Sequence, residues 1–312
     1  MMLPGISVNI GKLKLKNPVM VASGTFGYGE EFADFLDLKK LGAIVSKTIT
    51  LRPRRGNVPP RTCETPAGML NSIGLENPGI DRFIGEKIPV FKKIGIPLIV
   101  SIASEGGHEE FVILAETLDK INSVSAIELN ISCPNVKHSK LITQNSKLIS
   151  QDPKATFELV KKVRKATKKT LITKLSPNVT DIVEIAKAAE AAGSDAICLI
   201  NTLIGMSIDI NSRKPRIAAV TGGLSGPAIR PVAIRMVWEV YKKVKIPIIG
   251  MGGIMDASSA IEFLLAGATA VSVGTANFIE PRSSVEVIDG IRKYLIKNRI
   301  KNARQLIGEL EI

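Results

Sequence analysis

Apolar residues along this chain gather in short, nearly continuous runs that alternate with longer stretches of helical periodicity. Runs rich in Val, Ile, Leu and Ala, without polar alternation, are typical of strands buried on both faces of a parallel sheet. Eight such runs occur, at 18–22, 43–49, 97–102, 126–130, 171–175, 196–200, 246–249 and 270–273. Helical patterns follow them in turn, at 31–41, 80–94, 109–122, 153–166, 179–192, 229–244, 257–266 and 285–298.

Eight strand–helix units without a break in composition predict one domain over residues 1–312, an α/β (β/α)8 TIM barrel. The apolar runs 6–10 and 13–15 flank a Gly-Lys turn and predict a small N-terminal β-hairpin. Two segments rich in Gly, Pro and polar residues, 52–79 and 201–227, predict long loops at the C-terminal face. A doubly wound open sheet is the alternative, but the first strand ends in SGTFGYG rather than GxGxxG.

Composition and charge narrow the classes of function. Three cysteines without a CxxC pair, and two distant histidines, argue against a disulfide framework, a metal site and a Ser-His-Asp triad. The net charge of +13 is spread along the chain, so an anionic small substrate or an acidic partner fits better than a nucleic acid. Without a signal-peptide pattern or an apolar run of about 20 residues, we expect a cytoplasmic protein with no membrane contact.

The ends of the predicted strands carry the candidate chemistry, because the loops there form the active face of such barrels. Cys133 follows the run 126–130 in the segment NISCPN, where Pro134 must take the chain out of the sheet. A thiol there is either a functional group or a small buried side chain. Glycine-rich turns at 250–253 and 274–275 predict a phosphate site, since their N–H groups face helix starts.

Lysines and amides complete this set of strand-end residues. Lys47 and Lys174 suit an anionic cofactor, although either could instead form a Schiff base. The amides of Asn71, Asn130 and Asn201 offer donors and acceptors together, which matches a flat heterocycle with alternating N–H and C=O groups.

The segments that carry a family resemblance are ASGTFGYG at 22–29, SKT at 46–48, NSIGLENPG at 71–79, NISCPN at 130–135, KLSPN at 174–178, NT at 201–202, GGLSG at 222–226, GMGGI at 250–254 and VGTA at 273–276. Together they resemble the dihydroorotate dehydrogenase family, in its soluble FMN-containing branch with a catalytic cysteine. They look most like the catalytic subunit of the two-subunit, NAD-linked group.

The resemblance implies a flavoprotein oxidoreductase that converts dihydroorotate to orotate in the biosynthesis of UMP. Cys133 would remove the proton from C5 while a hydride passes from C6 to FMN. The residues implied for FMN are Ser23, Lys47, Thr48, Ser101, Asn130, Lys174, Ile200, Gly226, Gly252, Gly253, Gly274 and Thr275. Those implied for the substrate are Lys47, Asn71, Ser72, Ile73, Gly74, Leu75, Asn130, Asn201 and Thr202. Ser101 is a departure, because related chains often carry Asn there.

The resemblance also implies a homodimer, or a heterotetramer with a partner subunit that carries FAD and a 2Fe-2S cluster. This chain shows neither GxGxxG nor a cysteine cluster, so fumarate, a quinone or another acceptor stays open beside NAD. A related FMN barrel acting on dihydrouracil is the alternative within flavin chemistry. A non-redox barrel with a Schiff-base lysine and a flavin-binding interaction module are the alternatives outside it.

Overall fold

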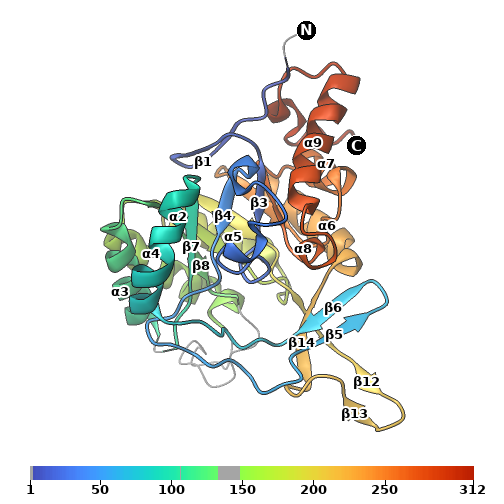
Figure 1. The fold of residues 1–312 in the computed structure, drawn as a ribbon. Helices are drawn as coiled ribbons and strands as arrows, with labels where there is room; N and C mark the ends of the chain where they lie inside the picture. The colour runs from blue at the N-terminus through green and yellow to red at the C-terminus, as the bar shows by residue number, and fades with distance from the viewer. Residues whose placement is uncertain (1–2, 106, 133–147) are drawn as a thin grey trace.

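The computed structural model describes residues 3–105, 107–132 and 148–312, so the predicted base Cys133 lies outside the described residues. Its centre is a closed barrel of eight parallel strands, which confirms the predicted fold (Figure 1). The strands are β3 (Val19–Val21), β4 (Ala43–Val45), β7 (Leu98–Ile102), β8 (Val124–Asn130), β9 (Thr170–Lys174), β10 (Ala196–Leu199), β15 (Ile248–Met251) and β16 (Ala270–Val273). They follow one another around the barrel in chain order, and β16 pairs back with β3 to close it.

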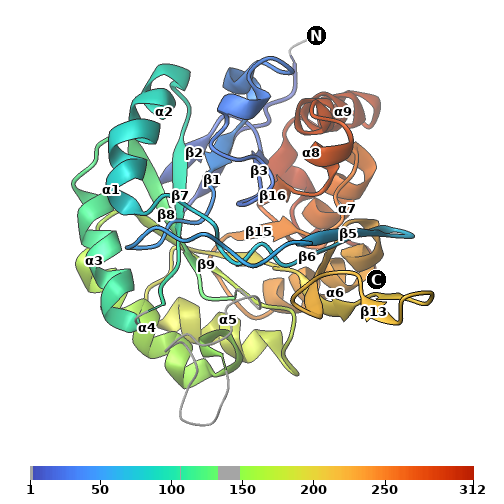
Figure 2. The same ribbon diagram turned by 60° about the horizontal axis from the view of Figure 1, so that its bottom comes forward.

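Helices surround the strands on the outside (Figure 2). They are α1 (Ile80–Arg82), α2 (Ile88–Ile94), α3 (His108–Asp119), α4 (Pro153–Ala166), α5 (Ile182–Ala191), α6 (Arg230–Tyr241), α7 (Ala257–Leu265), α8 (Ala276–Ile279) and α9 (Ser283–Lys297). A π-helical turn, Phe83–Lys87, joins α1 to α2, so the predicted helix over 80–94 is continuous. Among the helices of the described residues, none has both the length and the apolar character to cross a membrane.

Side chains on the barrel strands divide between two apolar cores. On β8, Ala126 belongs to the cluster inside the barrel, whereas Ile127 and Leu129 belong to the larger cluster between strands and helices. This division follows from the two-residue period of a strand, and it explains why both faces carry apolar residues. The site residues therefore come from the strand ends, where the inward-facing positions reach the opening.

The predicted N-terminal hairpin is confirmed, and it belongs to the barrel interior. Strands β1 (Val8–Ile10) and β2 (Leu13–Leu15) pair antiparallel. Val8, Ile10 and Leu15 join the interior cluster, while Gly11 lies against Thr170 and Asp195, at or beside the starts of β9 and β10. The hairpin thus closes the N-terminal end of the barrel and leaves the opposite end for the site.

The predicted helix over 31–41 is wrong. Two short 3₁₀ helices, Glu30–Phe32 and Leu38–Lys40, occupy that segment. Asp37 is the N-cap of the second, with an extended backbone, and its carboxylate accepts a hydrogen bond from the N–H of Lys39. A side chain that bonds its own backbone in this way interrupts a longer helix.

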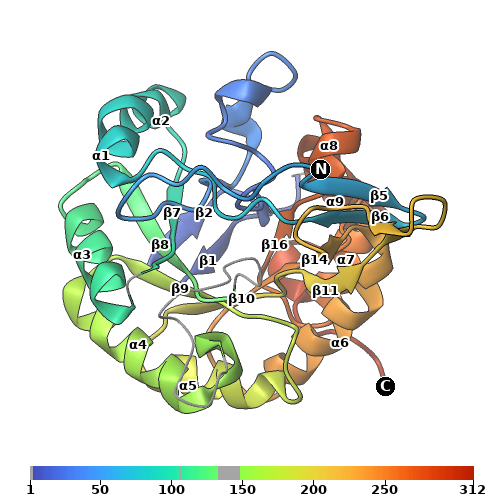
Figure 3. The ribbon, with the colours of Figure 1, turned by 90° about the horizontal axis from the view of Figure 1, so that it is seen from below.

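The two segments predicted as long loops are in part strands. Strands β5 (Thr62–Thr65), β6 (Gly68–Asn71), β11 (Leu203–Met206) and β14 (Thr221–Ser225) form an antiparallel sheet in the order β11-β14-β6-β5. Two further short strands, β12 (Ile208–Asp209) and β13 (Lys214–Pro215), pair beyond it. Figure 3 looks onto the end of the barrel on which these strands lie, which is the end where the parallel strands finish.

Candidate active site

A cavity of about 330 Å³ opens at the C-terminal end of the barrel, within the usual range of ligand pockets. Its wall combines barrel strand ends with the antiparallel sheet over them. The predicted residues that line it are Ser23, Lys47, Thr48, Asn71, Ile73, Gly74, Leu75, Asn130, Lys174, Ile200, Asn201, Thr202, Gly226, Gly252, Gly253, Gly274 and Thr275. One cavity thus collects residues from nearly the whole length of the chain.

Two predicted residues stand behind the wall rather than in it. Ser101 is fully buried, and its hydroxyl lies 3.0 Å from Thr48 Oγ1. Ser72 is also buried, and its hydroxyl accepts a hydrogen bond of 2.7 Å from the side-chain amide of Asn57. Ser101 therefore supports Thr48 of the wall, whereas Ser72 bonds to Asn57, which is not a wall residue.

Thr48 is the centre of a small polar network on one wall. Its Oγ1 lies 3.0 Å from Ser23 Oγ and accepts a hydrogen bond of 3.0 Å from Asn130 Nδ2, in addition to its contact with Ser101. These contacts fix the orientation of the Asn130 amide, which leaves its direction independent of any ligand.

The amide of Asn201 lies near that of Asn130. Its Nδ2 donates to Ser132 Oγ at 2.8 Å, and its Oδ1 accepts from the N–H of Thr202 at 2.8 Å. Ser132 Oγ donates in turn to Asn130 Oδ1 at 3.3 Å. Ser132 directly precedes Cys133 in the sequence, so these bonds fix the last described residue before the predicted base beside the cavity.

Lys174 brings a positive charge to the cavity. Its side chain is only 4% exposed, and no ion pair of the described residues includes it. A buried ammonium without a carboxylate in contact is costly, so this position favours an anionic or electron-rich group beside it. Lys47, from the segment after β4, is a second, half-buried lysine of the wall.

Glycines form a further part of the cavity wall. Gly226, Gly252 and Gly253 have φ values of 97°, 123° and 76°, which favour glycine. A Cβ built on Gly274 would meet no atom closer than Ala22 Cβ at 3.6 Å, and one on Gly24 would meet none within 4 Å. The space that these missing side chains leave, with backbone N–H groups beside it, fits a phosphate.

The helix after the Gly252–Gly253 turn has a charged N-cap. Asp256 accepts a hydrogen bond of 2.8 Å from the N–H of Ser259 at the start of α7, and this bond lowers the pKa of the carboxyl. The ionised carboxylate holds the first turn of α7 in place, and that turn follows directly on the glycines.

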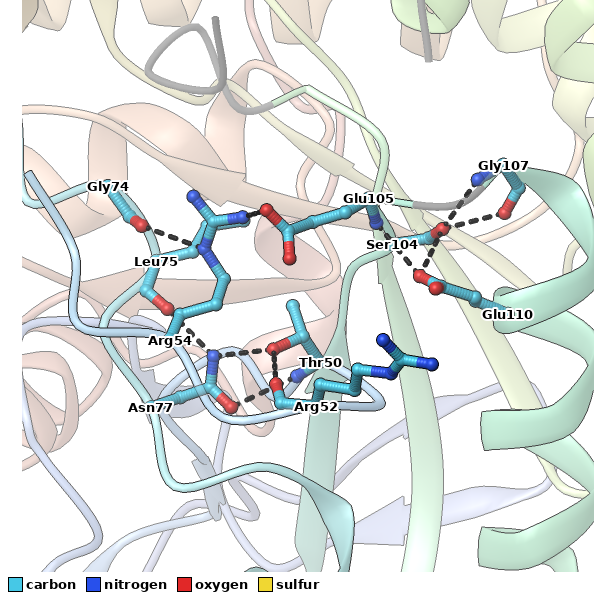
Figure 4. A network of polar contacts seen from close by, with 10 residues as sticks. All are labelled: Thr50, Arg52, Arg54, Gly74, Leu75, Asn77, Ser104, Glu105, Gly107 and Glu110. Carbon is cyan, nitrogen blue, oxygen red and sulfur yellow. Dashed lines mark hydrogen bonds and ion pairs between the residues drawn. The ribbon is translucent and has the colours of Figure 1, made fainter. Parts of the chain in front are cut away.

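The loop over 71–77 is held from outside the cavity (Figure 4). Arg54 donates through Nε to the carbonyl of Gly74 at 3.1 Å, and its guanidinium forms an ion pair with Glu105. Asn77 donates to the carbonyl of Leu75 at 2.7 Å, and Leu75 has a φ of 58°. These contacts hold a non-glycine residue in a left-handed conformation, which costs of order 1 kcal/mol without such support.

Sequence reasoning missed several residues of the wall. They are Ala22, Gly24, Thr25, Thr62, Met69, Glu76, Ser225, Ile229, Met251, Ser272 and Phe278. Some are neighbours of predicted positions, but Thr62 and Met69 come from the unpredicted sheet and Phe278 from the unpredicted helix α8. Arg54 was also missed, and its only signal in the sequence was the group of three arginines within 52–55.

Comparison with known proteins gives one consistent result. A family model described as dihydroorotate dehydrogenase matches residues 5–295. The dihydroorotate dehydrogenase B (NAD(+)) catalytic subunit of Geotalea daltonii is 55% identical over 309 residues, which are 99% of each chain. The protein of the same name from Bacteroides thetaiotaomicron is 52% identical over 307 residues, 98% of this chain and 99% of that one.

Proposed function

Because the chain belongs to the dihydroorotate dehydrogenase family, we propose that it oxidises dihydroorotate to orotate in UMP biosynthesis, as the catalytic subunit of an NAD-linked enzyme. The observation that carries the proposal is one cavity with a buried ammonium, fixed amides and a glycine-lined recess. A flat anionic pyrimidine and a phosphate-bearing cofactor are the two ligands that this set of groups suits.

FMN is the cofactor that we propose for this cavity. Gly226, Gly252, Gly253, Gly274 and Thr275 would hold its phosphate. Ser23, Thr48, Asn130, Lys174 and Ile200 would lie along its ring, with Ser101 acting through Thr48. When bound, FMN supplies the acceptor for the electrons that leave the substrate.

The proposed substrate site lies between the amides and Lys47. Asn71, Asn130 and Asn201 would pair with the alternating N–H and C=O groups of the pyrimidine, and Thr202 and residues 72–75 would complete the site. Lys47 would hold the substrate carboxylate. Lys174 would stabilise negative charge that develops at the cavity wall during oxidation.

Cys133 is the proposed base that takes the proton from C5 of dihydroorotate. A free thiol has a pKa of about 8.5, so a nearby cation helps it to act near neutral pH. The hydrogen bonds from Asn201 and to Asn130 that fix Ser132, its neighbour in the chain, support this role.

The proposed electron acceptor is NAD, reached through a partner subunit with FAD and a 2Fe-2S cluster in a homodimer-based heterotetramer. The names of the relatives support the existence of a partner subunit, because they describe catalytic subunits. Within the described ranges, no group of three or more His, Cys, Asp or Glu residues is placed to hold a metal ion.

The experiment that tests the function is single-turnover bleaching of the yellow protein by dihydroorotate without oxygen. Cys133→Ser should slow bleaching by about 10²- to 10⁴-fold at pH 7 while the flavin stays bound, because the base is lost. Cys63→Ser on β5 is the matched control and should bleach at the wild-type rate.

Two results would count against the proposal. Unchanged bleaching in Cys133→Ser would remove Cys133 from the role of base. Rapid bleaching by dihydrouracil, with none by dihydroorotate, would assign the cavity to the other substrate.

A further inference from the structure

Two charged side chains are buried among the described residues, and both lie in the barrel strands beneath the cavity. They are Glu128 and Lys174, which are 2% and 4% exposed. Glu128 stands two residues before Asn130 on β8, so its side chain points to the same inner face, one layer deeper than the wall of the cavity. Lys174 has a role in the proposed function, whereas Glu128 has none so far.

The register of the strands places the two charges diagonally on adjacent strands, because Glu128 pairs with Ile172 and Lys174 lies two residues further along β9. Asn130 on β8 pairs with Lys174 on β9, and Lys174 pairs with Cys198 on β10. Burial raises the pKa of the Cys198 thiol well above its usual value; the charge of Glu128 and a side-chain hydrogen bond with Glu128 raise it further, and the charge of Lys174 lowers it. The neutral thiol therefore lies within electrostatic reach of both charges.

Among the described residues, neither charge has a partner of opposite sign within 4.0 Å. Within the same part of the chain, Glu128 Oε1 is buried without a hydrogen-bond partner. Isolated buried charges are costly, whereas opposite charges attract over several ångströms in a medium of low dielectric constant that salt does not screen. Each is thus the available counter-charge for the other.

We propose that Glu128 is the counter-charge of Lys174, a positioning residue that directs the ammonium at the cavity. The use of that charge rests on the proposed function, but the pairing itself does not. The other titratable side chains around these strand ends are Lys47 after β4, Cys198 on β10 and Glu76 on the loop over 71–77.

A double-mutant cycle in thermal unfolding tests the pairing, with and without added FMN. Glu128→Gln and Lys174→Gln should each lower the melting temperature, because each leaves one buried charge alone. The double variant should recover most of the lost melting temperature, since it leaves no unpaired charge at these two buried positions. Glu116→Gln, on the exposed face of α3, changes the net charge by the same amount as Glu128→Gln and should have the melting temperature of the wild type.

Additive losses in this cycle would overturn the pairing. If a single variant fails to fold, a folded double variant is itself the rescue, and a double variant that also fails to fold overturns the proposal. The cycle needs no substrate, so its failure is distinct from a failure of dihydroorotate oxidation.

The midpoint potential of bound FMN tests the positioning role at pH 7. In Glu128→Gln, the ammonium of Lys174 loses the counter-charge that directs it at the cavity, so the potential should shift to more negative values, as in Lys174→Gln. The double variant should match Lys174→Gln. A positive shift in Glu128→Gln would show that Glu128 acts only as an independent negative charge, and no shift would show that it holds no charge; both results contradict the proposal.

Discussion

Individual polar residues at the cavity are held by partners that the protein itself supplies. Thr48 contacts Ser23, Ser101 and Asn130, so its hydroxyl and the Asn130 amide have defined directions before a ligand binds. Such preorganisation lowers the cost of ordering the site on binding. Ser101 stands behind this network and contacts Thr48, at a position where related chains often carry Asn.

At Gly274, a single added methyl group should weaken FMN binding without an effect on folding. A Cβ there would meet only Ala22 Cβ at 3.6 Å and Thr25 Cγ2 at 3.9 Å, so Gly274→Ala should fold normally. The methyl group would enter the proposed phosphate recess and weaken FMN binding by about 10- to 100-fold. Flavin fluorescence titration and thermal unfolding measure the two effects.

The control for Gly274→Ala is Gly5→Ala, whose Cβ would meet Asn302 Cβ at 3.6 Å and whose position is outside the cavity wall. It should leave FMN affinity unchanged. Wild-type affinity in Gly274→Ala would contradict the assignment of this recess to the phosphate.

The sequence correctly predicted cavity residues whose side chains lie at the end of a buried strand. Lys174 and Asn130 were predicted in this way, and both line the cavity. It failed for Arg54 and Phe278, because neither follows a barrel strand directly and each reaches its place through a loop or short helix.

At the scale of elements, the 71–77 loop depends on contacts with two other segments. Arg54 links the Gly74 carbonyl of this loop to Glu105 after β7. Asn77 bonds to the backbone and side chain of Thr50, which follows β4. The loop therefore forms one unit with these segments, and the conformation of Leu75 depends on their contacts.

Arg54→Lys should loosen this loop while it leaves the cofactor in place. A lysine has no planar fork, so it cannot bond to Gly74 and Glu105 with the same geometry. Loss of one such hydrogen bond costs about 1–1.5 kcal/mol, which predicts orotate binding that is roughly tenfold weaker. The perturbation of the flavin spectrum by orotate measures this affinity.

Arg82→Lys is the matched control for this change, because Arg82 forms an exposed pair with Glu86 on the outside of the barrel. It should bind orotate like the wild type. If Arg54→Lys retained full orotate affinity, or lost FMN together with orotate, the loop would not depend on Arg54 as described.

Prediction of elements succeeded where burial sets the pattern. The barrel strands were found because both of their faces are apolar. Helix α4 has the predicted bounds, and it begins at Pro153 because Asp152 caps it. The antiparallel sheet was missed because its strands are short and partly exposed. Its pairing of Asn71 with Gly223 joins segments that are far apart in the chain.

At the scale of the whole molecule, barrel closure joins the two ends of the chain at the site. Strand β16 pairs with β3, which brings Gly274 beside Ala22 and Thr25. The same cavity also receives Asn71 and Ser225 from the antiparallel sheet. The cavity is thus a property of the closed fold and of no single segment.

The proposed dependence on a partner subunit predicts how the isolated chain treats acceptors. Dihydroorotate should reduce its flavin, but NAD⁺ should not reoxidise it, because the chain carries no dinucleotide fingerprint. An artificial dye acceptor should reoxidise it and serves as the control. Stopped-flow absorbance follows these steps.

Rapid reoxidation by NAD⁺ without a second subunit would contradict the need for a partner. Reoxidation by fumarate or a quinone at the rate of flavin reduction would assign that compound as the acceptor instead.

The sequence by itself determined the barrel, its strand order and the chemical character of the strand ends. Buried parallel strands must be apolar, and their carboxyl ends must gather at one face, so the pattern fixes both. Only the tertiary structure decided that Ser101 stands behind Thr48, that Arg54 holds the 71–77 loop, and that Glu128 lies on the strand next to that of Lys174, one layer deeper. Such contacts join positions whose distance in space depends on register and barrel closure, and no local pattern of residues encodes them.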